Sequence, residues 1–269
     1  MSRRQRSVTR PGFDGFGVPI FVICRDKLTP LLELLAWLED AGYRRVYLVD
    51  NASTYPPLVE FLAQTHHEVI RREDNVGPYE SVWGAGLVTD LAASEYYVVT
   101  DSDIVPDPEC PPDAVDYFHC LLQRYPGYAK AGFSLRIDNL PEHYALKPEV
   151  MSWEGQWWWR PLERGVFHAP IDTTFALYRP ASAFTLAPSI RAGQPYWARH
   201  LPWYEVSDRP TAEQLYYRSH ALPGIAHWDQ QGQHRSAPAA RMPLRERLLW
   251  PLHARFKVSR DVSVDCRGK

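Results

Sequence analysis

Two aspartates separated by one residue give the clearest chemical signal in the sequence. Asp101 and Asp103 follow the apolar run YYVVT, which has the composition of a buried strand. Two like charges held this close repel each other unless a cation lies between them. Carboxylate oxygens suit a hard ion such as Mg²⁺ or Mn²⁺, which also binds phosphate oxygens. The pair therefore predicts a divalent-metal site with Mn²⁺ or Mg²⁺ as the cofactor, although a D-x-D by itself is more often a solvated turn.

Polar residues also follow the other apolar runs of the N-terminal half. Arg25 comes directly after the first run, Asp50 and Asn51 end the second, and Asn75 comes soon after the third. In parallel α/β sheets, ligands bind beyond the carboxyl ends of the strands. We therefore expect these residues to share one rim of a sheet with the D-x-D pair, an arrangement that a structural protein does not need.

The apolar runs predict the elements that position this rim. We expect strands at residues 18–24, 44–50, 67–72 and 95–100, and helices at residues 28–42, 57–64 and 79–93. For the first helix, Thr29 is the expected N-cap, Pro30 the first helical position and Gly42 the stop. Alternating strands and helices predict an α/β fold, Rossmann-like, with a mostly parallel central sheet flanked by helices.

The second half of the chain is less regular. We expect helices at residues 114–125 and 211–222, strands at 128–137, 171–180 and 224–228, and an irregular segment rich in Pro, Trp and Glu at about 138–170. A chain of 269 residues suits one large domain with appendages better than two full domains.

Composition limits the classes of partner. The net charge is −2 and no long basic stripe runs through the body of the chain, which disfavours nucleic acid. No stretch approaches the roughly 20 apolar residues of a membrane span, and the basic N-terminus lacks the apolar run of a signal peptide. The four cysteines form no C-x-x-C pair, and we expect reduced thiols. These features predict a cytoplasmic protein and leave its oligomeric state open.

Three segments, in order, resemble the nucleotide-sugar-binding half of GT-A fold glycosyltransferases, close to the family 2 type. LVDNAST is similar to the family's V-D-N-x-S turn, and DSD matches its D-x-D metal motif. Between them, Asn75, Gly77 and Gly86 match an N-x-G … N-x-G segment that lies along the nucleotide, whereas Gly84 stands where the family has its second Asn. The resemblance covers residues 18–108 well and the rest loosely.

The resemblance implies a role for each residue of the rim. The turn aspartate of the family usually contacts the nucleobase, and the implied nucleotide-binding residues are Arg25, Asp50, Asn51, Asn75, Gly77, Asp101 and Ser102. Two of them have structural alternatives. Asp50 can cap the turn that follows it, and Arg25 can pair with Asp26 or Glu73 instead of a phosphate.

The resemblance also implies the activity and the division of the chain. A sugar would move from a nucleoside-diphosphate sugar, with a UDP-sugar favoured, to a carbohydrate, lipid-linked or small-molecule acceptor. Residues 18–229 would form a single GT-A domain, with a nucleotide-binding half at about 18–108 and an acceptor half at about 109–229. Residues 1–17, rich in Arg and Gly, would be a flexible basic arm, and residues 230–269 a basic C-terminal extension.

Inverting members of the family need a carboxylate general base within reach of the acceptor hydroxyl. In many relatives it begins a late helix reading E-D-x-x-L-x-x-R. Here Ala212 occupies the usual Asp position, so Glu213 is the catalytic candidate, with a structural alternative as a first-turn acid favoured by the helix dipole. Asp172 is the second candidate, either as the base or as a ligand of sugar hydroxyls. Its structural alternative is to cap a strand through Thr173 or Thr174.

A histidine is expected to complete the metal shell. His227 resembles the family's C-terminal metal histidine, and we expect it to join the two aspartates of D-x-D, with His200 as the competing candidate.

Aromatic residues point to a carbohydrate site. The segment SWEGQWWWRP gathers four Trp in a polar stretch, and we expect Trp157 and Trp158 to face the acceptor or the sugar, although such rings also pack in cores. The basic amphipathic segment near residues 241–257 predicts possible peripheral membrane contact, or packing back on the domain.

Two other functions fit parts of the pattern. A nucleotidyltransferase acting on a sugar phosphate also combines a Rossmann-like sheet with acidic metal ligands, but it would carry a Gly-rich loop where this chain has CRDKLTP. A non-catalytic carbohydrate-binding relative would use the Trp cluster but would leave the aspartate pair unexplained.

Overall fold

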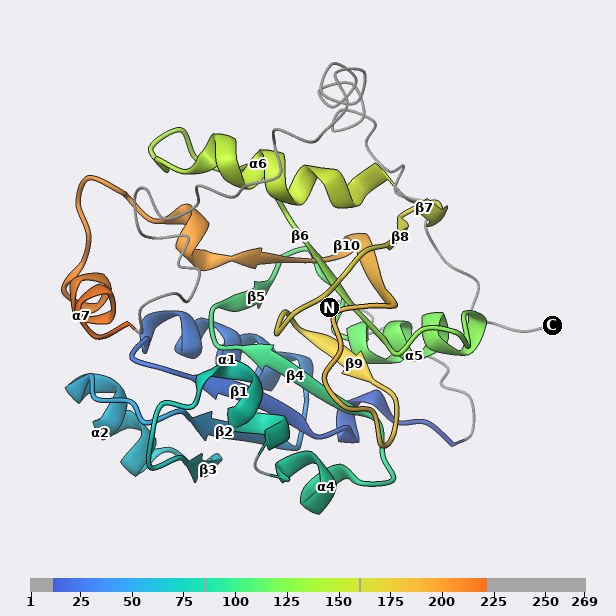
Figure 1. The fold of residues 1–269 in the computed structure, drawn as a ribbon, viewed down its shortest axis with the longest axis horizontal. Coiled ribbons are helices and arrows are strands. Elements are labelled where there is room, and N and C mark those ends of the chain that lie inside the picture. The colour runs from blue at the N-terminus through green and yellow to red at the C-terminus, as the bar shows by residue number, and fades with distance from the viewer. Residues whose placement is uncertain (1–11, 85, 160, 222–269) are drawn as a thin grey trace, which may run out of the picture.

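The computed structural model describes residues 12–84, 86–159 and 161–221 (Figure 1). The predicted strand at 224–228, His227, the C-terminal extension and the first eleven residues of the predicted arm lie outside these ranges. Of Trp159, only the backbone is described.

The N-terminal half is a parallel sheet of Rossmann type. Its strands and helices are β1 (Ile20–Cys24), α1 (Thr29–Ala41), β2 (Val46–Asp50), α2 (Pro56–Gln64), β3 (Glu68–Arg71), α3 (Gly77–Tyr79), α4 (Leu87–Ala92) and β4 (Tyr97–Asp101). The strands lie in the order β3-β2-β1-β4, and every neighbouring pair is parallel. This order places the topological switch point of the sheet between β1 and β4, and such folds bind their ligands at the switch point. The predicted α/β class is confirmed, with helices flanking a central sheet.

Strand β1 shows why the sheet is buried on both faces. All five of its residues are buried. Because successive side chains point to opposite faces, Ile20 and Val22 join one core with the apolar stripe of α1, whereas Phe21 and Ile23 join a second core with Val88 of α4. A continuous apolar run is what this double burial requires.

Helix α1 ends as predicted but begins differently. Gly42 adopts a φ of 95° and its amide bonds back to the carbonyls of the last turn, which is the expected glycine stop. Thr29 is the first helical residue instead of the N-cap, and the preceding Leu28 has no capping side chain. The cap comes from Glu213, 184 residues later, whose carboxylate accepts hydrogen bonds from the amides of Leu28 and Thr29.

The helix predicted for residues 79–93 is interrupted. Two short helices, α3 and α4, flank a π-helical turn at Glu80–Gly84. Gly86 precedes α4 with a φ of 70°, a conformation that breaks a right-handed helix.

The second half completes one mixed sheet. Its elements are β5 (Ile104–Pro106), α5 (Ala114–Arg124), β6 (Lys130–Leu135), α6 (Lys147–Gly155), β7 (Pro161–Glu163), β8 (Val166–His168), β9 (Ala176–Tyr178), β10 (Ser189–His200) and α7 (Ala212–His220). The sheet runs β3-β2-β1-β4-β9-β6-β10-β8-β7, with β5 paired to β10. Strand β9 is antiparallel to both of its neighbours. All pairs of the N-terminal half are parallel, as the sequence predicts, whereas among the described strands of the second half only β6 and β10 are parallel. Figure 1 shows α2 and β3 at one end of the molecule, and α6 with β7 and β8 at the other.

Strand β10 was not predicted from the sequence. Its twelve residues include Gly193 and Pro195, which break the alternation of apolar and polar positions. The register with β6 shifts between Ala192 and Trp197, so this interruption is accommodated as an irregularity within the strand.

One further expectation needs correction. Residues 12–17 of the predicted arm are packed. Phe13 stacks on His119 with ring centroids 3.7 Å apart, and Gly15 donates to Asp116. Cys24 and Cys110 are free and buried, as expected.

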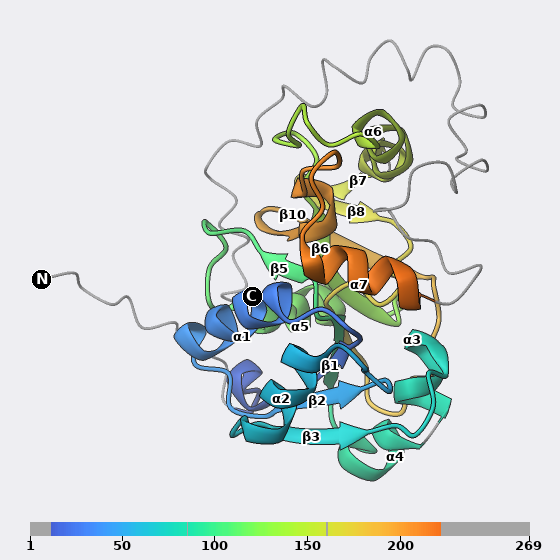
Figure 2. The ribbon, with the colours of Figure 1, turned by 90° about the vertical axis from the view of Figure 1, so that its left-hand side faces the viewer.

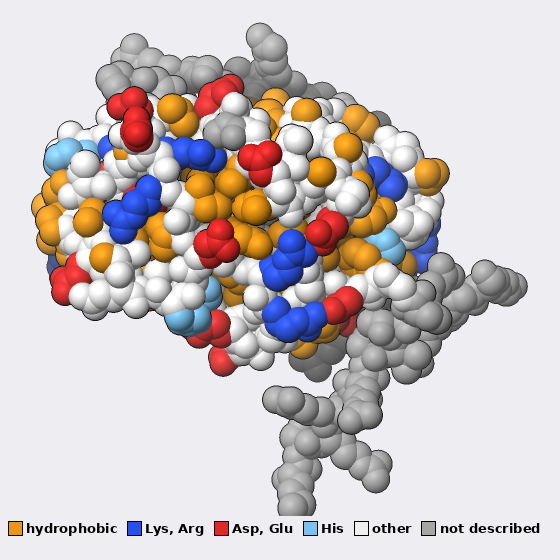
Figure 3. All heavy atoms as spheres, turned by 90° about the horizontal axis from the view of Figure 1, so that it is seen from below, with side chains coloured by type: hydrophobic (Ala, Val, Ile, Leu, Met, Phe, Trp, Pro, Cys, Tyr) orange, Lys and Arg blue, Asp and Glu red, His pale blue; other side chains and the backbone are white. Residues whose placement is uncertain are grey.

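The face in Figure 3 carries acidic and basic side chains intermixed around apolar ones. In the described part of the chain, no helix has both the length and the apolar character needed to cross a membrane.

Candidate active site

The carboxyl ends of β1, β2 and β4 form one rim, as the sequence predicts. Just past the strands, the amide of Asn51 donates to the carbonyl of Cys24 at 3.0 Å, and the amide of Ser102 donates to Ile23 at 3.1 Å. Backbone hydrogen bonds of the sheet therefore fix the loops that carry Asn51 and Ser102 against the end of β1.

Asp101 is held from the side by the loop before β9. Its amide donates to the carbonyl of Thr173 at 2.8 Å, and the Thr173 hydroxyl donates to Asp101 Oδ2 at 2.5 Å. Burial raises the pKa of Asp101 well above its usual value, and the charge of Asp103 raises it further. The side chain would hold its negative charge at a lower free-energy cost beside a cation.

Asp103 lies between a lysine and a histidine. Lys27 Nζ is 3.2 Å from Asp103 Oδ2, and His200 Nε2 is 3.6 Å from Asp103 Oδ1. All three side chains are largely buried, with exposed fractions of 11% for Lys27, 13% for Asp103 and 16% for His200. Burial alone would raise the pKa of Asp103, but Lys27 and His200 outweigh it and hold the pKa below the usual value. Asp103 is therefore ionised at neutral pH.

The backbone explains how His200 reaches Asp103. His200 ends β10 and pairs with Ile104 of β5, the residue that follows Asp103. The amide of Leu201 then donates to the carbonyl of Asp103 at 3.0 Å. The imidazole packs edge-on against Trp203, with ring centroids 4.7 Å apart. Among the described residues, His200 is thus the histidine at D-x-D, whereas His227 lies outside the described ranges.

The donor set at this point fits a divalent ion. Two ligands about 2.1 Å from a shared ion lie about 3.0–3.4 Å apart, so the 3.6 Å between Asp103 Oδ1 and His200 Nε2 needs a shift of only a few tenths of an ångström. Lys27 already shows that a cation is stable against this carboxylate. Asp101 turns toward Thr173 and is not part of a three-ligand group in the described chain.

Three of the residues predicted to bind the nucleotide, Asn51, Asn75 and Gly77, form a connected network. Asn51 Nδ2 donates to Asn75 Oδ1 at 2.8 Å, and Asn51 Oδ1 accepts from the amide of Val76 at 3.1 Å. Asn75 Oδ1 also accepts from the amide of Gly77 at 3.2 Å. Gly77 has a φ of 83°, a conformation that favours glycine. The two asparagines therefore shape the loop that leads into α3.

Asp50 and Arg25 make the structural contacts that were their alternatives. Asp50 Oδ1 accepts from the amide of Ser53 at 2.9 Å, which caps the turn after β2. Arg25 pairs with Asp26 at 3.1 Å and donates to the carbonyls of Asn51 and Ala52. The base contact of Asp50 and the phosphate contact of Arg25 remain predictions.

Asp172 lies close to Asp101, on the loop before β9. Its Oδ1 accepts from the amide and the hydroxyl of Thr174, at 3.1 and 2.7 Å, which is the predicted capping alternative. The side chain is nevertheless exposed. Its charge contributes to the raised pKa of Asp101, and Thr173, which holds Asp101, is its neighbour in the chain.

Glu213 lies in the first turn of α7, as the sequence predicts, and its carboxylate reaches the start of α1. Both of its contacts go through Oε1, which is 2.5 Å from the amide nitrogen of Leu28 and 3.0 Å from that of Thr29. A carboxylate at a helix N-terminus satisfies free amides and complements the helix dipole. Glu213 therefore has a structural role in joining α7 to α1.

Helix α7 also approaches the loop after β2. Tyr216 donates to the carbonyl of Thr54 at 2.8 Å, and the ammonium of Lys27 lies 4.1 Å from the centre of the Tyr217 ring. In Figure 2, α7 crosses the molecule between α6 and α2, in front of α1.

The two tryptophans differ from each other. Trp158 packs against Phe167 and the core, with centroids 5.1 Å apart, which is the packing alternative, and its contact with the sugar or the acceptor stays a prediction. Trp157 lies edge-on to Trp153, and its indole N–H is buried without a hydrogen-bond partner among the described residues.

Three residues of this region were missed by the sequence analysis. Lys27 was read as part of a loop, and its partner Asp103 lies 76 residues away. Lys130 is fully buried and donates to the Tyr178 hydroxyl at 2.7 Å and to the carbonyl of Asp172 at 3.3 Å. Burial lowers its pKa to about 7.

Tyr79 is the third missed residue. It is exposed, stacks near Phe184 with centroids 4.1 Å apart, and is close enough to Asp172 and Asp101 for their charges to add to the effect of burial in raising its pKa. The buried lysine in an apolar run was a usable sequence signal, because lysine is rarely buried without a reason. No such signal marked Lys27 or Tyr79.

Comparison with known proteins gives structural likenesses only. No protein-family model matches the sequence, and no curated protein does. Among the solved structures, the chain is similar to glucosyl-3-phosphoglycerate synthase from Mycobacterium tuberculosis. The complex with phosphoglyceric acid has 16% identity, and the complex with Mn²⁺, uridine diphosphate and glucosyl-3-phosphoglycerate has 18%. Each has a TM-score of 0.34 over 64% of this chain, which spans 63% of the length of either structure. The roles of this chain's residues rest on its own contacts.

Proposed function

We propose that this chain is a divalent-metal-dependent glycosyltransferase of the GT-A type, which transfers a sugar from a nucleoside-diphosphate sugar, a UDP-sugar by preference, to an acceptor hydroxyl. The observation that carries the proposal is the convergence of Asp103, His200 and Lys27 beside the carboxyl ends of β1 and β4. A carboxylate, an imidazole and an ammonium at a Rossmann-type switch point suit a metal-bound diphosphate.

Asp103 and His200 would hold the ion, Mn²⁺ or Mg²⁺, with Asp101 as an outer or additional ligand. The ion would stabilise the negative charge that develops on the departing diphosphate. Lys27, freed from part of its interaction with Asp103, would remain near the phosphates as a fixed positive charge.

The nucleoside would lie against the loop ordered by Asn51 and Asn75. This loop is held by side-chain hydrogen bonds before any ligand binds, so little conformational entropy would be lost on binding. Asp50 and Arg25 lie at the same rim and are proposed to contact the base and a phosphate.

Asp172 is the favoured general base. It is exposed, adjacent to the D-x-D aspartates through Thr173, and its hydrogen bonds fall on one oxygen. In the proposed step, Asp172 accepts the proton of the acceptor hydroxyl while the oxygen of that hydroxyl forms a bond to the anomeric carbon. The bond from that carbon to the diphosphate oxygen breaks, and its electron pair leaves on the nucleoside diphosphate. Glu213 is proposed to act only as a positioning residue for α1.

Tyr79 is the ring that we propose for contact with the sugar or the acceptor. It is exposed and electrostatically coupled to Asp172 and Asp101, unlike the packed Trp158. Apolar ring faces suit the C–H faces of sugars.

The test is calorimetric titration of the full chain with UDP, GDP and dTDP, each with and without Mn²⁺. We expect one nucleotide to bind in a metal-dependent way, and we expect Asp103→Asn and His200→Ala each to weaken it by about 100-fold or more. Glu142→Gln is the matched control, because Glu142 is an exposed carboxylate that pairs with Lys147 and not with a residue of the rim. Metal-independent binding, or equal binding by Asp103→Asn, would refute the proposal.

The product separates this activity from its nearest alternative. Incubation with the nucleotide sugar of the preferred base should release the nucleoside diphosphate in a metal-dependent way. Release of pyrophosphate from a nucleoside triphosphate and a sugar phosphate would identify a nucleotidyltransferase instead.

A further inference from the structure

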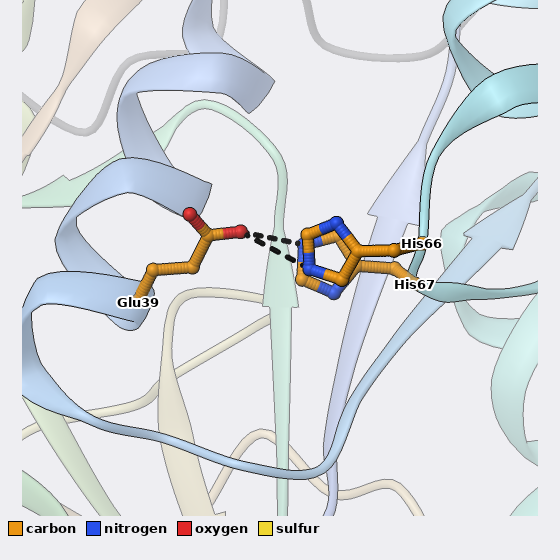
Figure 4. Close-up of side chains that lie close together, drawn as sticks. All are labelled: Glu39, His66 and His67. Carbon is orange, nitrogen blue, oxygen red and sulfur yellow. Dashed lines mark hydrogen bonds and ion pairs between the residues drawn. The ribbon is translucent and has the colours of Figure 1, made fainter.

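A second cluster of metal-binding side chains lies at the opposite end of α1 from Lys27. Glu39 is in the last turn of α1, and His66 and His67 form the turn between α2 and β3. His67 Nε2 is 3.1 Å from Glu39 Oε1, and His66 Nε2 is 3.5 Å from the same oxygen. Figure 4 shows both imidazoles, roughly one above the other, directed at this carboxylate. In the described part of the chain, this is the one group of three potential ligands whose donor atoms lie within 4.8 Å of one another.

The spacing of the donor atoms matches a tetrahedral ion. Zinc binds imidazole nitrogen and carboxylate oxygen at about 2.0–2.2 Å, so two ligands of one zinc ion lie about 3.3–3.6 Å apart. The two distances at Glu39 are close to that range before any ion is present. The two imidazoles are also close to each other, because the ring centroids of His66 and His67 are 4.2 Å apart.

We propose that Glu39, His66 and His67 form a binding site for a borderline transition-metal ion, with Zn²⁺ as the main candidate. Two imidazoles and one carboxylate leave one position of a tetrahedral ion for water. Nitrogen ligands favour Zn²⁺, Ni²⁺ or Cu²⁺, whereas Mg²⁺ and Mn²⁺ prefer oxygen. The site is independent of the proposed transferase activity.

Access and anchoring both suit reversible binding. The exposed fractions are 78% for the His66 side chain and 50% for Glu39, so an ion can enter from solvent. His67 is only 9% exposed, which fixes one ligand against the protein. An ordinary surface hydrogen bond would need only one of the two histidines. Both rings approach one oxygen, and this convergence is what indicates a shared ion.

The ion would tie α1 to the turn that leads into β3. Glu39 and His67 are separated by 28 positions in the sequence, so the ion would join two segments that are not adjacent in the chain. An ion that binds the folded chain and not the unfolded chain stabilises the fold by an amount that grows with its concentration. The expected role is therefore stabilisation of the edge of the sheet at β3.

The experiment uses the full chain, stripped with a chelator and then titrated with ZnCl₂ by calorimetry. The rim is unchanged in every variant, so any zinc that it binds is common to all of them. We expect Glu39→Gln, His66→Ala and His67→Ala each to weaken one equivalent of Zn²⁺ binding by more than about tenfold. His143→Ala is the matched control, because His143 is an exposed histidine outside the cluster.

A spectroscopic readout tests the geometry directly. Co²⁺ in place of Zn²⁺ should give the intense visible absorption of a four-coordinate ion, lost in His66→Ala and His67→Ala. The proposal is overturned if the three cluster variants bind Zn²⁺ as tightly as the His143→Ala control, or if no Zn²⁺ binds at micromolar concentrations. Circular dichroism of the metal-free variants should match the parent, which shows that any loss of binding is not unfolding.

Discussion

The two ends of helix α1 lie beside two clusters of carboxylate and imidazole groups that differ in burial. At the N-terminal end, Asp103 and His200 are buried, and Lys27 provides a cation inside the protein. At the C-terminal end, Glu39 and His66 are open to solvent, and the carboxylate faces two imidazoles. A charge removed from water needs a partner within the fold, whereas an exposed charge is stabilised by solvent.

The difference has a chemical consequence. At the rim, an incoming divalent ion competes with an ammonium that already occupies one oxygen of the carboxylate. At the far end, it competes only with water and protons. We therefore expect the rim to bind its metal well only together with a diphosphate, and the far cluster to bind its ion alone.

Breaking the buried pair should have the largest effect on the fold. Asp103→Asn removes the charge that faces Lys27, and the loss of one partner from a buried ion pair costs about 3–5 kcal/mol. The expected result is a lower free energy of unfolding, measured by urea denaturation. In Lys27→Met with Asp103→Asn, most of the loss should be recovered. An unchanged single variant would contradict the view that this pair is effectively buried.

Lys130, whose ammonium is hydrogen-bonded to the Tyr178 hydroxyl and the Asp172 carbonyl, should behave differently. The folded-state pKa of Lys130 is about 7, below its unfolded value, so the unfolded chain binds this proton first as the pH falls. Relative to Lys130→Met, the wild-type free energy of unfolding should therefore fall by roughly 3 kcal/mol between pH 9.5 and pH 7, and level off about one pH unit lower. Urea denaturation of both proteins across this range measures it. Parallel pH profiles would show that Lys130 stays charged.

Glu213 and Asp172 should separate stability from catalysis. Glu213→Ala removes the cap of α1 and should cost about 0.5–2 kcal/mol of stability. Asp172→Asn should leave stability nearly unchanged and lower the rate of sugar transfer by about 100-fold or more, as expected for a general base. Thermal unfolding and product release from the nucleotide sugar measure the two effects. The reverse pattern would return Glu213 to the role of base.

The smallest effect is expected at the far cluster without metal. His66→Ala changes an exposed side chain, so the free energy of unfolding should stay within about 0.5 kcal/mol of the parent. With Zn²⁺ at 100 times its dissociation constant, the parent should gain about 2.7 kcal/mol and the variant should not. A zinc-dependent gain of equal size in both proteins would remove the contrast between the two ends of α1.

The rim was predictable because it depends on local patterns. Apolar runs locate the strands, and the residue after each run must lie at the carboxyl end, so Asp50, Asn51 and Asp101 were placed correctly relative to the sheet. The mixed order of the second half was not predictable. Strand β10 contains Gly193 and Pro195, and β9 is only three residues long.

The contacts that tune the site were beyond local patterns. Lys27 meets Asp103 across 76 positions, and Glu213 meets Leu28 across 185. Such pairs depend on how β10 and α7 return to the first helix, and composition or periodicity carries no information about that return. His200 was named only as a competitor for the same reason.

Helix α7 has no buried residue, although it touches both α1 and the loop after β2. Its contacts with the rest of the fold include those of Glu213, the Tyr216 hydroxyl and ring, and the ring of Tyr217 over Lys27. Segments with little buried apolar surface open at a low free-energy cost while the rest of a fold stays intact. The amides at the start of α1 and the ammonium of Lys27 can therefore lose and regain their contacts with α7 without global unfolding. Amide hydrogen exchange at the start of α1 would then report the opening of α7 rather than that of the sheet.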